Sequence, residues 1–163
     1  MRRESSGIPT IVLVLLGGIV AVVLLVHALH RGSAEPAHYA ARPALTPGAL
    51  NPDVTPQTIR STICSRGWTK TIRPPSSWTS ELKLEQLRQY GFAGGPADYE
   101  EDHFVSLELG GAPRDAKNLW PERRPQANRV DGVENDLNAQ VCSGQLSLAE
   151  AQRKLAELKW TQG

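Results

Sequence analysis

The longest apolar stretch of the chain lies near its N-terminus. No polar side chain occurs from Ile11 to Val26, and only His27 interrupts the extension of this run to Leu29. At about 1.5 Å per helical residue, residues 11–29 span roughly 28 Å, which is close to the thickness of the hydrocarbon core of a bilayer. The pattern predicts one transmembrane helix within residues 1–30.

Two arginines, Arg2 and Arg3, precede this apolar run. The positive-inside rule therefore places the N-terminus in the cytoplasm and the rest of the chain outside it. A cleaved signal peptide is the alternative, although the run is longer than the usual h-region and no clean cleavage site of small residues follows it. We expect a single-pass protein of the cell membrane with an extracytoplasmic, periplasmic domain, or a secreted protein if the segment is cleaved.

The composition changes after the apolar run. Residues 31–53 are rich in Pro, Ala and Gly and show no hydrophobic periodicity, which is typical of a tether. Hydrophobic patterning returns after this segment. The folded unit is therefore expected over residues 54–163.

Within residues 54–163, short apolar patterns are separated by Gly and Pro. They predict, in chain order, a helix from Thr55 to Cys64, a short strand or extended segment over 68–72, a helix from Thr79 or Ser80 to Gly91, a strand over 103–109, renewed order at 118–120, a helix over 128–141 and a last helix. Ser147 and Glu150 form a capping box at the start of that last helix, and its apolar face carries Leu148, Ala151, Leu155 and Leu158. The mixture predicts an α+β fold.

The charge of the chain is balanced overall and uneven locally. With 18 Lys and Arg against 17 Asp and Glu, the net charge of +1 excludes a globally basic nucleic-acid binder. Segment by segment, the charge is +4 over residues 54–80, −5 over residues 98–108 and +3 over residues 109–130. An acidic centre between basic flanks suits a local metal and phosphate site, and ordinary solvated faces explain any single run equally well.

The two cysteines, Cys64 and Cys142, both lie in the expected folded unit. A disulfide is the favoured interpretation in an exported domain. A reactive or metal-binding pair is the alternative, but neither cysteine belongs to a Cys-x-x-Cys motif or has a neighbouring histidine. Two cysteines also exclude a disulfide framework and a four-cysteine zinc site.

Candidate chemistry is concentrated in residues 99–121, which read YEEDHFVSLELGGAPRDAKNLWP. His103 is the only histidine after the tether, and it follows three acidic residues. The Asp-His pair, the Gly-Gly turn and the Asn-Leu-Trp that follows resemble the HNH family of ββα-metal endonucleases over about residues 98–138. The resemblance implies a small ββα-metal core with additional flanking helices. It also implies that His103 is the general base, that Asp102 is a metal ligand, and that Asn118 fixes the loop and orients the histidine ring.

The chain departs from the HNH pattern at the last metal ligand, because no histidine follows His103. Asn128 stands nearest to the expected spacing. Asp131 and Glu134 lie three residues apart on the same predicted helix and are alternative ligands. An oxygen-rich site suits Mg²⁺ or Mn²⁺, while a histidine also tolerates Zn²⁺ or Ni²⁺.

Two functions follow from these observations. The first is a metal-dependent, HNH-like endonuclease that hydrolyses DNA or RNA in the cell envelope, with a neutral base and a divalent cation at the phosphodiester. The second is a non-catalytic binding or structural module of the envelope on a degenerate HNH scaffold.

The expected partners are the membrane, through the N-terminal helix, and the phosphates of nucleic acid; no protein partner is inferable. Candidate phosphate contacts are Arg114, Lys117, Arg123 and Arg124. Base stacking by Trp68, Trp78 or Trp120 is a further interpretation, with core packing as its alternative.

Overall fold

The computed structural model describes residues 39–161, and the predicted transmembrane segment lies outside this range. Between residues 39 and 161, no helix is both long enough and apolar enough to cross a bilayer. The first described residues belong to the predicted tether, and they pack on the domain: Ala40, Ala41 and Thr46 are buried. The packed unit therefore includes residues that the composition assigned to a linker.

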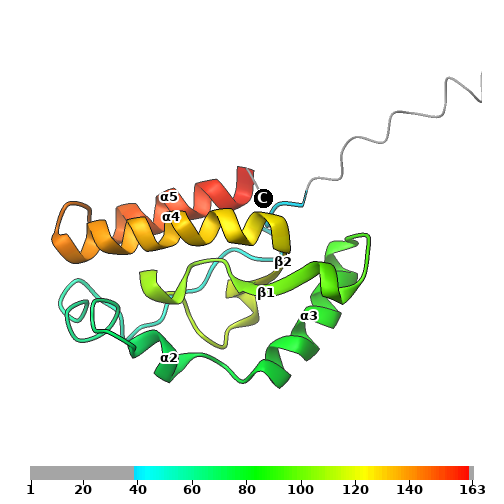
Figure 1. Ribbon diagram of the computed structural model, residues 1–163, viewed down its shortest axis with the longest axis horizontal. Coiled ribbons are helices and arrows are strands. Elements are labelled where there is room, and N and C mark those ends of the chain that lie inside the picture. The colour runs from blue at the N-terminus through cyan, green and yellow to red at the C-terminus, as the bar shows by residue number, and fades with distance from the viewer. Residues whose placement is uncertain (1–38, 162–163) are drawn as a thin grey trace, which may run out of the picture. The chain divides into compact units, whose positions relative to one another are not determined.

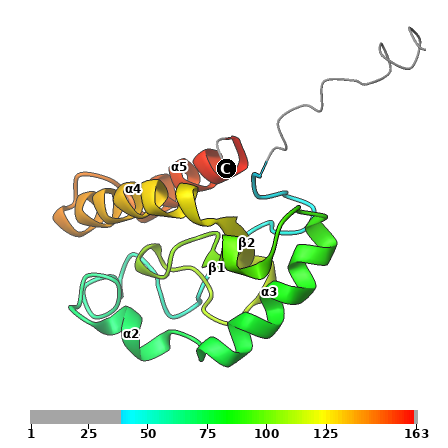
Figure 2. The ribbon, with the colours of Figure 1, turned by 45° about the vertical axis from the view of Figure 1, so that its right-hand side comes forward.

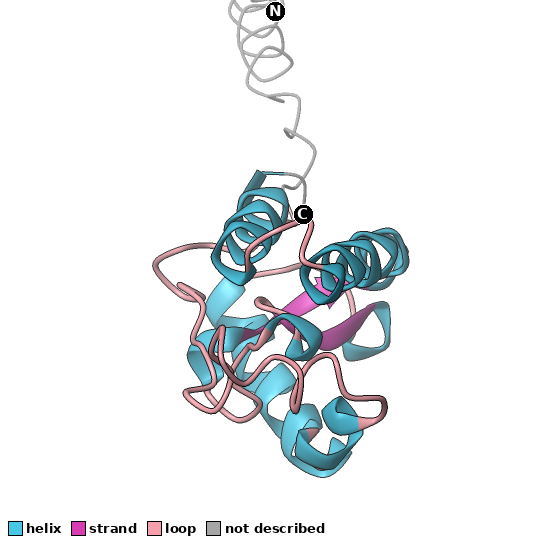
Figure 3. Cartoon of the chain, turned by 90° about the vertical axis from the view of Figure 1, so that its left-hand side faces the viewer, coloured by secondary structure: helices cyan, strands magenta, loops and turns pink. Residues whose placement is uncertain are grey.

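The domain is built around a two-stranded antiparallel sheet and belongs to the α+β class, as the sequence predicts. Strand β1 spans Tyr99–His103 and β2 spans Leu119–Arg123, with Tyr99 opposite Arg123 and His103 opposite Leu119. Helix α4 (Arg124–Ser143) follows β2 directly and pairs with α5 (Leu148–Thr161), while α3 (Ser76–Tyr90) precedes β1. The α4–α5 hairpin and α3 lie on opposite sides of the strands (Figures 1 and 2). Figure 3 shows the small sheet enclosed by helices and loops.

Three predicted helices are present, and their ends follow from local chemistry. Helix α3 ends at Gly91, whose φ of 63° is the left-handed conformation that favours glycine. Helix α4 starts earlier than predicted because Pro125 suits its first turn. Helix α5 begins with the predicted capping box, in which the Glu150 carboxylate accepts from Ser147 N and the Glu150 N–H donates to Ser147 Oγ.

Three other predicted elements were wrong. Residues 68–72 form the short helix α2 (Trp68–Ile72) and not a strand, because their β-branched residues have no neighbouring strand to pair with. Residues 55–64 form successive turns in place of a helix, since threonine hydroxyls bond the local backbone, as Thr58 Oγ1 does to Asp53 O at 2.6 Å. The strand predicted over 103–109 ends at His103, and residues Leu107–Leu109 form one turn of 3₁₀ helix.

The core fills the space between the sheet and the helices. Its fully buried members include Phe104, Leu109, Trp120 and Leu155, so Trp120 is a packing residue and is not available to stack on bases. The predicted disulfide between Cys64 and Cys142 is present, with an S–S distance of 1.99 Å. It attaches the turns before α2 to the end of α4. In the chain-entropy view, closing a loop of 78 residues contributes about 4 kcal/mol.

Candidate functional site

The two predicted central residues, Asp102 and His103, are neighbours on β1 and therefore point to opposite faces of the strand. The Asp102 carboxylate contacts Lys159 of α5. The His103 ring contacts the carbonyl of Pro113, in the loop between the strands. Each face of β1 thus carries its own polar site.

The Asp102 site is organised around the ammonium group of Lys159, whose side chain is 0% exposed. Lys159 Nζ donates hydrogen bonds to Asp102 Oδ2 at 2.5 Å and to the backbone carbonyl of His103 at 2.7 Å. It also forms an ion pair with Glu134 Oε1 on α4 at 2.7 Å, and Glu122 Oε2 on β2 lies 3.9 Å away. We call Lys159, Asp102, Glu122 and Glu134 the lysine cluster.

Burial and charge together set the protonation of the lysine cluster. Burial alone would lower the pKa of Lys159, but the carboxylates of Asp102, Glu134 and Glu122 outweigh it and raise that pKa. Burial would raise the pKa of Asp102, and the Lys159 charge holds it below its ordinary value. Burial and the nearby Asp102 charge raise the pKa of Glu122 to about 9 and, against the pull of Lys159, that of Glu134 to about 7. At neutral pH the cluster therefore holds a Lys159–Asp102 ion pair and a protonated Glu122.

The residues present do not fit a divalent cation at Asp102. Oxygen atoms of Asp102, Glu134 and His103 do converge on one cation, but this cation is the ammonium of Lys159. A catalytic metal needs a coordination position open to water or substrate, and the buried lysine side chain fills this place. Within residues 39–161, no group of three His, Cys, Asp or Glu side chains is arranged to hold a metal ion.

The predicted last ligands lie at different places on α4. Glu134 is buried and belongs to the lysine cluster, whereas Asn128 and Asp131 are exposed. Sequence reasoning thus named Asp102 and Glu134, which do meet, and missed Lys159, which joins them. One signal for it was present: Lys159 follows Leu155 by four residues, so it continues the apolar face of α5.

On the other face of β1, His103 is only 5% exposed. Its Nε2 lies 3.1 Å from the Pro113 carbonyl oxygen, which can only accept a hydrogen bond. Nε2 therefore carries the proton and Nδ1 keeps its lone pair. Burial lowers the pKa of His103, so the ring is neutral at pH 7. This tautomer and charge state are those of a general base.

Asn118 fixes the loop that supports the His103 ring. Its side-chain oxygen accepts from Val105 N at 2.9 Å, and its amide nitrogen donates to Val105 O and Ala112 O, each at 3.0 Å. Ala112 directly precedes Pro113, so the Asn118 amide bonds the residue next to the one whose carbonyl contacts His103. Gly111 permits this closure, because a Cβ there would lie 1.7 Å from Val105 O. These three hydrogen bonds of the Asn118 side chain connect the beginning and the end of the loop between the strands.

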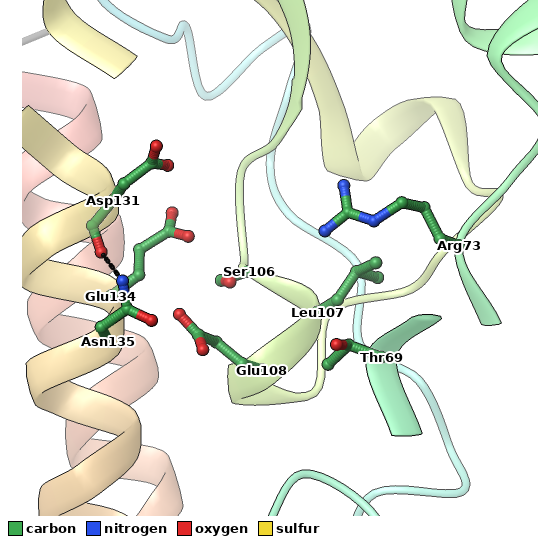
Figure 4. Close-up of a pocket in the computed structure, with 8 residues that line it drawn as sticks. All are labelled: Thr69, Arg73, Ser106, Leu107, Glu108, Asp131, Glu134 and Asn135. Carbon is green, nitrogen blue, oxygen red and sulfur yellow. Dashed lines mark hydrogen bonds between the residues drawn. The ribbon is translucent and has the colours of Figure 1, made fainter. Parts of the chain in front are cut away.

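A polar cleft of 290 Å³ opens beside the lysine cluster (Figure 4). Asp131, Glu134 and Asn135 line it from α4, and Ser106 and Glu108 line it from the loop after β1. Arg73 and Thr69 line the opposite side. Glu108 had no role in the sequence analysis, although it belongs to the acidic run. Glu134 belongs both to this cleft and to the lysine cluster.

The four predicted phosphate contacts are all exposed. Arg114 and Lys117 lie on the loop between the strands, and Arg123 and Arg124 lie where β2 meets α4. The Arg123 guanidinium lies 4.5 Å from the centre of the Tyr39 ring, and Arg124 pairs with Glu100 at 3.5 Å. These basic groups thus occupy two separate places on the surface.

Comparison with known proteins adds no relative: the chain matches no family model, no curated protein and no solved structure.

Proposed function

We propose that residues 39–161 are a nucleic-acid-binding module on an HNH-like ββα scaffold, and that the module does not hydrolyse its ligand by a metal-dependent route. The observation that carries this proposal is the Lys159 ammonium, which occupies the point where Asp102 and Glu134 converge. A monovalent group whose contacts are all to protein oxygens cannot bind an activated water or a phosphate oxygen. It therefore supplies neither the nucleophile nor the Lewis acid that a metal provides.

The order of elements supports an HNH-like scaffold. Asp102 and His103 end β1, Asn118 precedes β2, and α4 follows β2 and carries Glu134. This order matches the strand, loop, strand and helix implied by the resemblance.

The surface charge supports an anionic ligand more strongly than the formal charge does. Part of the acidic run over 98–108 is not available to repel phosphate: Asp102 is paired with Lys159, and burial and the Asp102 charge raise the pKa of Glu101 to about 8. The four predicted phosphate contacts, in turn, are exposed. Phosphate contacts of this kind give binding that depends on salt and little on sequence.

Hydrolysis is the second candidate, and His103 is the observation that favours it. A neutral imidazole with a protonated Nε2 and a free Nδ1 is prepared to accept a proton from water. Its burial opposes this role, since an attacking water would have to reach Nδ1.

Both candidates are tested on the full chain purified in detergent. Binding is measured by fluorescence anisotropy with labelled single-stranded DNA, duplex DNA and RNA at 50 and 200 mM salt. Cleavage is measured on plasmid and RNA with Mg²⁺, Mn²⁺ or chelator. We expect salt-sensitive binding and no cleavage above a chelator control. Absence of binding to all three ligands contradicts the proposal, and cleavage that needs metal and is lost in His103→Ala establishes the nuclease.

A further inference from the structure

We infer that Lys159 is a built-in substitute for a divalent cation, and that the cavity it fills becomes a site for a hard cation such as Mn²⁺, Ca²⁺ or Mg²⁺ when the ammonium is removed. The inference deepens the proposed function, because it explains why an HNH-like scaffold would lack a metal-dependent reaction. It also assigns Glu122 and the His103 carbonyl to the site, which the motif alone does not do.

The atoms that contact Lys159 Nζ are all oxygens. Asp102 Oδ2, His103 O and Glu134 Oε1 lie within 2.7 Å of the nitrogen, and Glu122 Oε2 lies at 3.9 Å. Carboxylate and carbonyl oxygens are the ligands that hard cations prefer, at about 2.1–2.5 Å. Three of the four oxygens therefore need to move by only a few tenths of an ångström. Glu122 would have to approach farther.

Three elements direct a carboxyl group toward the point that the ammonium occupies: Asp102 lies on β1, Glu122 on β2 and Glu134 on α4. Asp102 and Glu134 contact the ammonium directly, whereas Glu122 lies farther away. A divalent cation at this point would carry a second positive charge for the second of these two carboxylates.

A route into the site is available through Glu134. This residue lines the 290 Å³ cleft (Figure 4). It also contacts Lys159. Truncation of the lysine beyond Cβ would leave the volume of three methylenes and the ammonium for an ion and its waters. The cleft would supply those waters and admit the ion.

The test compares the wild-type chain with Lys159→Ala, and uses Lys154→Ala as the matched control because Lys154 is an exposed lysine on the same helix. Each protein is unfolded thermally with chelator and with 1 mM Mn²⁺, and free Mn²⁺ is titrated by electron paramagnetic resonance. We expect Mn²⁺ to raise the Tm of Lys159→Ala by at least about 5 °C and to bind with a stoichiometry of one. The wild type and Lys154→Ala should shift by less than about 1 °C.

A further substitution locates the ion. Adding Asp102→Asn to Lys159→Ala should remove the Mn²⁺ effect, because it deletes a charged ligand. If Lys159→Ala is unfolded without metal, circular dichroism during Mn²⁺ addition replaces the melting experiment, and recovery of helical signal is the expected result. Equal behaviour of Lys159→Ala with Mn²⁺ and with chelator, in either format, overturns the inference. This outcome is independent of the wild-type binding and cleavage assays, so the two proposals can fail separately.

Discussion

The two faces of β1 satisfy their buried polar side chains in different ways. On one face, Asp102 depends on charged side chains from other elements, Lys159 of α5 above all. On the other face, His103 is neutral and contacts the Pro113 carbonyl, in a loop that Asn118 bonds at the neighbouring Ala112. The first arrangement requires four side chains to match in charge, whereas the second requires a loop to keep its shape. Substitutions and pH should therefore affect the two faces differently.

The largest effect is expected from removing the charge at the lysine cluster. Lys159→Met keeps most of the side-chain volume but leaves Asp102 without its partner. Breaking a buried ion pair in this way costs about 3–5 kcal/mol. Urea unfolding followed by circular dichroism measures the change, with Lys154→Met as the exposed control. A loss below about 1 kcal/mol would show that Lys159 does not hold the cluster together.

Removing the side chain that fixes the loop on the histidine face should lower stability somewhat less. Asn118→Ala leaves the Val105 N–H and two carbonyl groups without their partner, and the expected loss is about 3 kcal/mol. The loop should also release His103, so the pKa of its ring should rise toward the ordinary value. Urea unfolding and NMR titration of the ring protons measure the two changes. A variant that loses stability but keeps the lowered pKa of His103 would separate Asn118 from the ring.

The lysine cluster should respond to pH because Glu122 and Glu134 are buried, and Glu101, which is partly buried and shares the histidine face of β1, adds to this response. Burial raises the pKa of Glu134, Glu101 and Glu122 to about 7, 8 and 9, above their ordinary value of 4.5. The folded state then binds more protons than the unfolded state between pH 4.5 and 9, so stability falls as pH rises through this window. Asp102 acts oppositely, since its lowered pKa favours folding above the ordinary value of 3.8 and that stability is lost at lower pH.

Glu122→Gln isolates one part of this pH dependence. The amide mimics the protonated acid, so the variant should gain little over the wild type at pH 5 and progressively more toward pH 9, by up to about 1.4 kcal/mol for each pH unit. Urea unfolding at pH 5, 7 and 9 measures the difference. Equal slopes of stability against pH for the two proteins would mean that Glu122 is charged in the folded state.

The smallest effect on stability is expected outside both faces. Lys117 is exposed, so Lys117→Ala should change the free energy of unfolding by less than about 0.5 kcal/mol. Its effect should appear in anisotropy measurements, as weaker binding to every nucleic acid and a salt dependence reduced by about one phosphate contact. Unchanged binding would remove Lys117 from the interface.

The comparison also explains which parts of the domain the sequence could predict. Local signals predicted α3 and α5, because Gly91 and the Ser147 capping box act over short distances. The disulfide was predicted because the chain has only two cysteines. The HNH resemblance singled out Asp102 and Asn118, whereas Glu134 was one of three alternatives for the last ligand, after Asn128. Lys159 lies 57 residues from Asp102 along the chain, and only the docking of α5 brings them together. The strand predicted over residues 68–72 was wrong for a related reason. A strand requires a neighbouring strand, and the local pattern does not show whether one is present.

The most direct measurement is ¹⁵N–¹H NMR of the lysine ammonium groups in the wild-type protein. The account predicts one ammonium signal protected from solvent exchange at pH 7, absent in Lys159→Met and unmoved by 10 mM Mg²⁺. A Lys159 ammonium that exchanges freely, or whose signal is displaced as Mg²⁺ takes its place, would contradict the claim that the chain supplies its own cation.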